Sequence, residues 1–292
     1  MTNKIAASLA PVDTETCLAA LHQLAPAISM AEIRLDLMIS FDLQRLIAET
    51  PCPLIITCRP LREGGRFSGA EGERLDILTQ AMDLNCAYVD SEWDSLAILA
   101  GRRQTLTQLI ASRHWLDHMP SDLWATYAEL RERAEVVKLV GQARRPGDML
   151  PIFDLLRRAT TPVIGLAMGE AGRLTRLIAP CFPHCFLTYA APTGADLTAA
   201  GQLTVQEMIH TYHAEALGPG TKIHLHLCAT EPSAETIVAQ NQSATPGEIV
   251  HIPLVIAPEE VQELVPILRA CLPRLTLTAD PTFSHLEDAA RG

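Results

Sequence analysis

The stretch AEIRLDLMISFDLQRLIAE, residues 31–49, contains two patterns of hydrophobic residues, the first with the period of a strand and the second with the period of a helix. Apolar and charged side chains alternate over 31–37, which predicts a strand, and apolar residues recur at helical spacing over 42–49. The pattern occurs eight times before residue 217, and eight such units predict an α/β fold, a closed parallel (β/α)8 TIM barrel. A doubly wound open sheet is the alternative, but no GxGxxG turn follows the first strand. We expect strands at 4–10, 31–37, 53–59, 87–93, 107–113, 135–141, 162–168 and 185–191, and helices at 14–23, 42–49, 71–83, 95–100, 121–133, 147–158, 170–178 and 203–215.

The run Gly218-Pro219-Gly220 marks a boundary after the eighth unit. The residues beyond it predict a C-terminal βαβαβ extension, which has no place in a barrel that is already closed. We therefore expect two parts, 1–217 and 218–292. The elements expected in the second part are strand 222–229, helix 233–242, strand 248–256, helix 258–271 and strand 274–279.

Composition excludes several classes of protein. The chain has 292 residues, 48 % of them hydrophobic, and a net charge of −11, so it is too apolar for a disordered segment and too acidic for a non-specific nucleic-acid binder. No apolar run approaches the ~18 residues of a membrane span. The apolar stretch near the N-terminus is too short for the core of a signal peptide. We expect a cytoplasmic location, with neither nucleic acid nor membrane as a partner. The eight cysteines are scattered through apolar segments, so we expect reduced, packed thiols. Cys181, His184 and Cys185 lie close together in the sequence, but no second ligand pair accompanies them, so we expect no zinc site.

Charged residues interrupt the predicted strands near their C-terminal ends, where the functional loops of a barrel lie. On the second strand Glu32, Arg34 and Asp36 share one side, and this side faces the interior because helices cover the outside. Each such residue alone could belong to an interior ion network, and a lone histidine is usually structural. Further polar residues at these ends are Arg59, Glu63, Asp90, Glu92, Arg113, His114, Arg176 and Gln202.

Lys138 is the most informative of these residues, because lysine occurs only at positions 4, 138 and 222. Val136, Val137, Leu139 and Val140 surround it in a buried strand, where an unpaired ammonium is costly. Burial and neighbouring arginines favour the neutral amine, which can attack a carbonyl, although a structural pair with a glutamate is the alternative. An activatable amine, an imidazole and several arginines around one cavity suit a keto substrate that carries a carboxylate.

Residues 1–217 resemble type I 3-dehydroquinate dehydratase, an enzyme of the shikimate pathway, over its whole length. Seven ordered motifs carry the resemblance: EIRLD at 32–36, TCRPLREGG at 57–65, VDSE at 89–92, SRH at 112–114, VVKL at 136–139, MGEAGRLTR at 168–176 and AGQ at 200–202. The resemblance implies a (β/α)8 barrel and a lyase that converts 3-dehydroquinate to 3-dehydroshikimate without metal or cofactor. We also expect a homodimer.

The resemblance also implies roles for individual residues. Lys138 resembles the lysine that forms a Schiff base with the ring ketone, and His114 the general base and acid, which suits an imidazole that titrates near neutrality. Arg176 would hold the substrate carboxylate, and Gln202 would contact the substrate from the loop after the eighth strand. Glu63, assigned to the catalytic group, would orient His114. The substrate-binding set is completed by Glu32, Arg34, Arg59 and Thr198. Thr198 replaces the family's usual serine, and a proline is lost at the same place.

The second part, 218–292, resembles the beginning of the substrate-binding half of shikimate dehydrogenase. The resemblance is carried by Thr221-Lys222-Ile223, Asn241 and His251-Ile252-Pro253-Leu254. The serine pair expected before Asn241 is replaced by Ala234 and Thr236, so we expect a degenerate, non-catalytic fragment. Two alternatives to the dehydratase stay open: a Schiff-base aldolase on the same barrel, and a non-catalytic scaffold descended from the enzyme.

Overall fold

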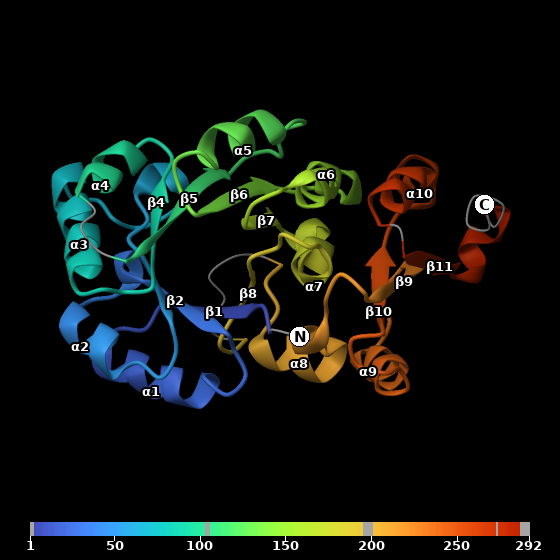
Figure 1. The fold of residues 1–292 in the computed structure, drawn as a ribbon. Helices are drawn as coiled ribbons and strands as arrows, with labels where there is room; N and C mark the ends of the chain where they lie inside the picture. Colours follow the sequence, from blue (N-terminus) through green and yellow to red (C-terminus); the bar gives the residue numbers. More distant parts are fainter. Residues whose placement is uncertain (1–2, 103–105, 195–200, 273, 287–292) are drawn as a thin grey trace.

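A parallel sheet of eight strands curls into a barrel in the computed structural model, which describes residues 3–102, 106–194, 201–272 and 274–286 (Figure 1). The strand order is β7-β6-β5-β4-β3-β2-β1-β8, and a bridge between Val163 and Cys185 joins the segment before β8 to β7. The ring is therefore nearly closed, which confirms the predicted barrel. Its strands are β1 (Ile5–Leu9), β2 (Met30–Arg34), β3 (Leu54–Thr57), β4 (Tyr88–Glu92), β5 (Gln108–Trp115), β6 (Val136–Gln142), β7 (Val163–Met168) and β8 (Thr188–Ala190).

Helices cover the outside of this barrel, one after each strand. Outward side chains such as Val137 and Leu139 of β6 are fully buried and belong to the large cluster between strands and helices. In the described residues, no helix is long and apolar enough to cross a membrane. The helices are α1 (Thr14–Leu24), α2 (Leu43–Glu49), α3 (Glu71–Asp83), α4 (Leu96–Arg102), α5 (Trp124–Leu130), α6 (Leu150–Arg158), α7 (Arg173–Ile178) and α8 (Val205–Tyr212).

A second, smaller apolar cluster fills the inside of the barrel. Ile55, Ile110, Val136, Ile164 and Leu187 point inward and pack together. Each fully buried aliphatic side chain of this kind contributes about 1.5–3 kcal/mol relative to an exposed one. Because side chains alternate along a strand, the next inward residue of β6 after Val136 is Lys138. The apolar cluster is thus the floor on which the polar residues lie.

The second strand is shorter than predicted. It ends at Arg34 instead of residue 37, and the chain turns into the 3-10 helix η1 (Leu35–Leu37). Asp36 in this turn accepts two hydrogen bonds from the Arg34 guanidinium and one each from the backbone N–H of Arg59 and Arg66. These four bonds stabilise the turn against continuation of the strand. The eighth strand is also shorter, and the helix expected at 170–178 is divided into η4 (Glu170–Gly172) and α7.

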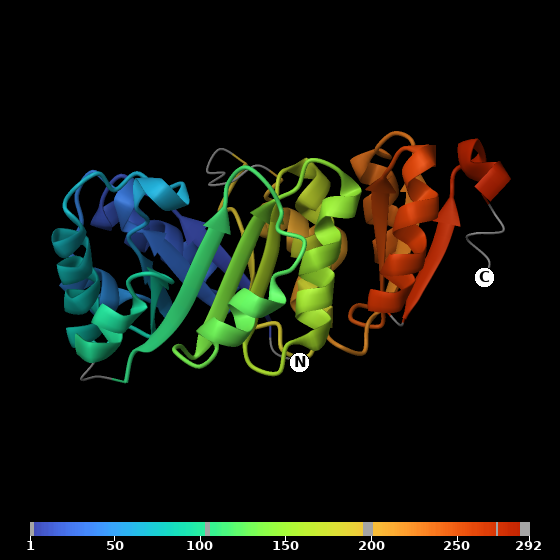
Figure 2. The same cartoon turned by 90° about the horizontal axis from the view of Figure 1, so that it is seen from above.

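The C-terminal part forms a separate parallel sheet beside α6, α7 and α8 (Figures 1 and 2). Its strand order is β10-β9-β11, and the predicted βαβαβ order of elements is confirmed. The Asn241 amide accepts from the backbone N–H of His251 and donates to its carbonyl, so that α9 is fixed against β10. An ion pair between Arg173 and Glu231 links this C-terminal part to α7. The elements are β9 (Lys222–Cys228), α9 (Ala234–Gln242), β10 (Ile249–Val255), α10 (Pro258–Cys271), β11 (Leu275–Ala279) and the 3-10 helix η7 (Pro281–Leu286).

Candidate active site

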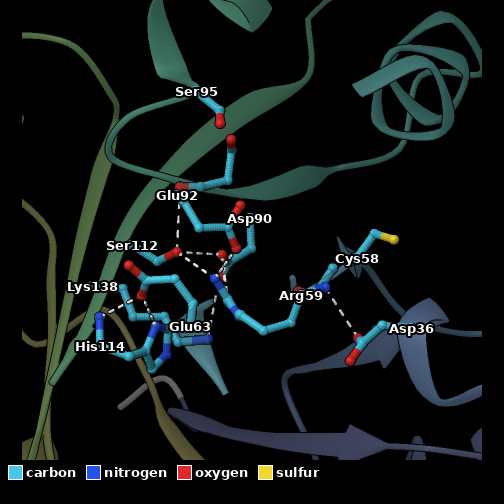
Figure 3. A network of polar contacts seen from close by, with 12 residues as sticks. Asp36, Cys58, Arg59, Glu63, Asp90, Glu92, Ser95, Ser112, His114 and Lys138 are labelled. Carbon is cyan, nitrogen blue, oxygen red and sulfur yellow. Dashed lines mark hydrogen bonds and ion pairs between the residues drawn. The ribbon is translucent and has the colours of Figure 1, made fainter. Parts of the chain in front are cut away.

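Lys138 of β6 reaches into the network of polar side chains inside the barrel (Figure 3). Its Nζ donates to Glu32 Oε1 and Asp90 Oδ2, both at 2.9 Å, and to the Tyr189 hydroxyl at 3.2 Å. The side chain is buried, so these contacts compensate for the loss of water around the amine. Its direct partners are thus two carboxylates and a phenol, and not the arginines that the sequence analysis placed beside it.

Glu32 and Asp90 are both buried and come from the strands β2 and β4. Burial alone would raise the pKa of each carboxyl. The Lys138 ammonium nevertheless holds the pKa of Glu32 below its usual range, and Arg59 together with Lys138 does the same for Asp90. Glu32 also accepts from the hydroxyls of Ser8 at 2.9 Å and Thr57 at 3.0 Å. Two ionised carboxylates therefore face the amine.

Arg59 follows β3 and turns back into the barrel. Its guanidinium donates to Asp90 at 2.7 Å, to Glu92 at 2.5 Å and to the Ser112 hydroxyl at 2.7 Å. Despite burial, these two carboxylates raise the pKa of Arg59, which stays charged. The chain can fold back here only because residue 65 is glycine: a Cβ at Gly65 would lie 2.0 Å from the Arg59 carbonyl oxygen. Arg59 lines the cavity, but these contacts belong to an interior ion network.

His114 of β5 and Glu63 of the 3-10 helix η2 (Leu61–Glu63) form a pair at the side of the cavity (Figure 3). Glu63 Oε2 accepts from the backbone N–H of His114 at 2.7 Å and lies 3.0 Å from His114 Nδ1. Burial raises the pKa of Glu63 to about 7. Burial, Arg59 and Lys138 lower the pKa of His114 well below its usual value. The imidazole is thus held neutral, in contrast with the expected titration near neutrality.

Arg176 enters the cavity from α7, and the motif before it sets its direction. The Thr175 hydroxyl accepts from the Ala167 backbone N–H at 3.0 Å and donates to the Gly172 carbonyl at 2.7 Å, which clamps the turn between β7 and α7. Gly172 has no room for a Cβ, which would lie 2.5 Å from the Ala167 oxygen. Among the described residues nothing accepts a hydrogen bond from the buried Arg176 Nε. Burial lowers the pKa of Arg176 to about 10, so the guanidinium is still charged at neutral pH.

The other predicted substrate-binding residues lie around the same cavity, with one exception. Arg34 lines the cavity, and its guanidinium donates two hydrogen bonds to Asp36 at 2.7 and 2.9 Å. Gln202 lines the cavity from the segment before α8. Thr198 lies outside the described residues. The cavity has a volume of about 110 Å³ and is lined by Ser8, Glu32, Arg34, Arg59, Glu63, Gly64, His114, Leu116, Lys138, Val140, Leu166, Met168, Arg176, Tyr189 and Gln202.

Tyr189 and Ser8 were missed by the sequence analysis. Both contact Glu32, and Tyr189 also contacts Lys138. The available signal for Tyr189 was its position two residues after Leu187 on the predicted eighth strand, which places both side chains on the inward face. In the part of the chain that the structure describes, no group of three or more His, Cys, Asp or Glu side chains is arranged to hold a metal ion. All eight cysteines are free thiols in the structure; Cys52 and Cys181 are partly buried and the other six are buried.

Comparison with known proteins gives the same family for most of the chain. The model of the family "Type I 3-dehydroquinase" matches residues 5–218. A 3-dehydroquinate dehydratase of Desulfotalea psychrophila is 33 % identical over 190 residues, which are 61 % of this chain and 83 % of that protein. A chloroplastic bifunctional 3-dehydroquinate dehydratase/shikimate dehydrogenase of Arabidopsis thaliana is 30 % identical over 73 % of this chain, which spans only 37 % of that relative.

Solved structures show likeness of fold for both parts of the chain. A 3-dehydroquinate dehydratase from Geobacillus kaustophilus superposes with a TM-score of 0.61 at 21 % identity, covering 83 % of this chain and 92 % of that one. The dehydroquinate dehydratase and shikimate dehydrogenase of S. pombe AroM superposes with a TM-score of 0.63 at 22 % identity. It covers 98 % of this chain and 58 % of that chain, so the likeness includes the second sheet.

Proposed function

Because the chain belongs to the type I 3-dehydroquinase family, we propose that it is a lyase that dehydrates 3-dehydroquinate to 3-dehydroshikimate through a Schiff base. One observation carries the proposal: the buried amine of Lys138 and the neutral imidazole of His114 line one small cavity with the guanidinium of Arg176. An amine for the ketone, a base for the proton and a cation for the carboxylate are the three groups that this reaction needs.

Lys138 forms the covalent bond to the substrate. One proton of the ammonium passes to His114, and the freed amine attacks the ring ketone carbon. His114 returns this proton to the hydroxyl of the adduct, which leaves as water and gives an iminium ion. This ion keeps the positive charge next to Glu32 and Asp90, which already face a cation in the free protein. The two carboxylates therefore stabilise the iminium without any rearrangement of charge.

His114 then moves the protons. With Glu63 ionised, His114 Nδ1 donates to the carboxylate and Nε2 carries the lone pair. We assign to Nε2 the removal of the proton from the carbon next to the iminium, and the return of this proton to the departing hydroxyl as water. Hydrolysis of the unsaturated iminium releases 3-dehydroshikimate and restores the amine, so the net change is the loss of one water molecule.

The remaining polar groups bind and orient the substrate. We assign the carboxylate to Arg176, because a guanidinium fork suits a carboxylate and the Nε has no acceptor among the described residues. Arg34, Arg59, Glu32 and Gln202 are assigned to the hydroxyl side of the ring, with Thr198 as a further candidate. The expected homodimer and cytoplasmic location stay predictions.

The most direct test is to mix the protein with 3-dehydroquinate and borohydride and to measure the intact mass. Borohydride reduces an imine irreversibly, so a covalent adduct is expected, together with a rise in enone absorbance when borohydride is left out. Absence of both the adduct and the enone signal would contradict the dehydratase and favour the scaffold. An aldolase would instead cleave a carbon–carbon bond and yield two products.

The pH dependence of kcat/KM is expected to follow Glu63. Its pKa is raised to about 7 by burial, so the carboxyl gains a proton as the pH falls through neutrality. A protonated Glu63 donates a hydrogen bond to His114 Nδ1, so the imidazole proton lies on Nε2 instead. Nε2 then has no lone pair with which to act as a base. We therefore expect kcat/KM to fall about tenfold per pH unit below about pH 7. Steady-state rates between pH 5 and 9 measure this.

Glu63→Gln is the control for this assignment, because glutamine does not titrate. The variant is expected to be slower at all pH values and to lose the acidic limb of the profile. If the acidic limb persists unchanged in Glu63→Gln, another group causes it and the assignment is wrong.

Residues 218–292 are proposed to be a non-catalytic domain, so their deletion is expected to leave kcat/KM within about threefold of the full chain. The reason is that no residue of this part lines the described cavity. The deletion uncovers α6 and α8, which pack against α10 and α9, so size-exclusion chromatography and circular dichroism are needed to select folded protein. Large loss of turnover in a folded, monodisperse truncation would contradict this proposal.

A further inference from the structure

Glu170 makes a contact that none of the assigned roles explains. It opens the 3-10 helix η4, six residues before Arg176, and its Oε1 accepts from the backbone N–H of Gly201 at 3.1 Å. Gly201 directly precedes Gln202, whose side chain lines the cavity. The carboxylate thus joins the segment after β7 to the segment that carries a proposed substrate contact.

Gly201 can approach η4 only because it is glycine. Its φ is +73°, and a Cβ built there would lie 2.3 Å from the Gly169 carbonyl oxygen. Gly169 has a φ of +87°, and a Cβ there would lie 2.6 Å from the Ala143 carbonyl oxygen. Positive φ angles of this size are strained for other residues. Two glycine backbones in contact, with a carboxylate on the amide of one of them, form a built contact between the two segments.

The partner segment, the turn between β7 and α7, is held by hydrogen bonds of its own. The Gly172 N–H donates to the Gly169 carbonyl at 2.9 Å, and the Thr175 hydroxyl clamps the same turn. Gln202 is followed in the chain by Leu203. The Leu203 carbonyl accepts a hydrogen bond at 2.8 Å from the backbone N–H of Ala191, the residue after β8. Gln202 is therefore held between two backbone anchors, one on η4 and one on β8.

We propose that Gly169, Glu170 and Gly201 form a clasp that positions Gln202 over the cavity and thereby sets substrate affinity. This inference rests on the proposed dehydratase function. Glu170 is a positioning residue in it, since it acts on the substrate through Gln202. Because Gln202 binds substrate and takes no part in proton transfer, loss of the clasp raises KM more than it lowers kcat.

Two substitutions and two controls test the clasp. Gly201→Ala is expected to raise KM at least tenfold, and Gly220→Ala, where a Cβ meets nothing within 4 Å, is expected to leave KM unchanged. Glu170→Ala is expected to raise KM about fivefold, since it removes one hydrogen bond to a charged group. Glu170→Gln keeps an acceptor oxygen for the Gly201 N–H and is expected to restore most of the affinity. A glutamine variant as weak as the alanine variant would attribute the effect to charge near Arg176 and overturn the clasp.

Amide hydrogen exchange of the full chain without substrate separates this inference from the function. The Gly201 amide is expected to be protected in the wild type and in Glu170→Gln and to exchange at least tenfold faster in Glu170→Ala. If the wild type exchanges as fast as Glu170→Ala, the clasp does not exist, whatever the activity. If the wild type forms no product while Gly201 is protected by Glu170, the proposed function fails and its consequence for KM fails with it. Equal KM values in an active wild type and in Gly201→Ala also overturn the positioning role.

Discussion

Lys138→Ala is expected to lower kcat on the order of 10⁴-fold or more and to abolish the borohydride-trapped adduct. The reason is that the variant lacks the nucleophile, and no other described residue that lines the cavity carries an amine. The other two lysines are Lys4, just before β1, and Lys222, the first residue of β9. Neither of them lines the cavity. Intact mass after reduction and the rate of enone formation measure both effects.

The variant must be shown to fold, because removing Lys138 leaves Glu32 and Asp90 as buried carboxylates without their cation. Breaking a buried pair costs about 3–5 kcal/mol. Lys138→Arg keeps the charge without a nucleophilic amine and is the second variant, with Lys222→Ala as a matched surface control that is expected to keep the adduct. A trapped adduct of normal yield on folded Lys138→Arg would show that a different amine reacts, and the Schiff-base assignment would be wrong.

Much of the site could be predicted because a parallel barrel gathers the C-terminal ends of its strands at one face. The positions of Lys138 and His114 on neighbouring strands follow from the alternation of strands and helices alone, and the register pairs Ser112 with Lys138. The inward direction of Glu32 follows from the period of two along β2. These predictions needed only local patterns and one rule of topology.

What could not be predicted depends on contacts between distant segments. Arginines were expected around Lys138, but Arg59 is paired with Asp90 and Glu92, and the partners of the amine are carboxylates. A strand pattern gives the side on which a residue lies and not its hydrogen-bond partner. The neutral state of His114 likewise depends on burial and on charges from several strands, so no local motif contains it.

The contact between Tyr189 and Lys138 also could not be predicted from a local pattern. An aromatic residue on a predicted core strand is most simply interpreted as packing, and its ring does pack against the apolar floor. Its hydroxyl nevertheless bonds to Lys138 and lies 3.4 Å from Glu32. Only the closure of the ring, which brings β8 beside β1, places this hydroxyl at the amine.

His114→Ala is expected to lower kcat by about 10²–10⁴-fold, the usual contribution of a general acid or base. In contrast to the loss of Lys138, it leaves the amine and its two carboxylates in place, so borohydride still traps an adduct on Lys138, at a reduced rate. The imine accumulates in this variant because the next step, removal of the proton from the neighbouring carbon, lacks its base. Single-turnover rates and intact mass after reduction separate the two steps.

A matched control is His118→Ala, four residues along the same segment, whose exposed imidazole pairs with Asp117. It is expected to leave kcat unchanged. His114→Ala also removes the imidazole partner of Glu63, but the backbone N–H of residue 114 still donates to this carboxylate. If His114→Ala loses the adduct as completely as Lys138→Ala, the imidazole is needed before the imine forms and its main role lies in carbinolamine chemistry. If instead kcat is unchanged, the proton is removed by another group, and among the described residues that line the cavity Glu63 is the carboxylate in contact with residue 114.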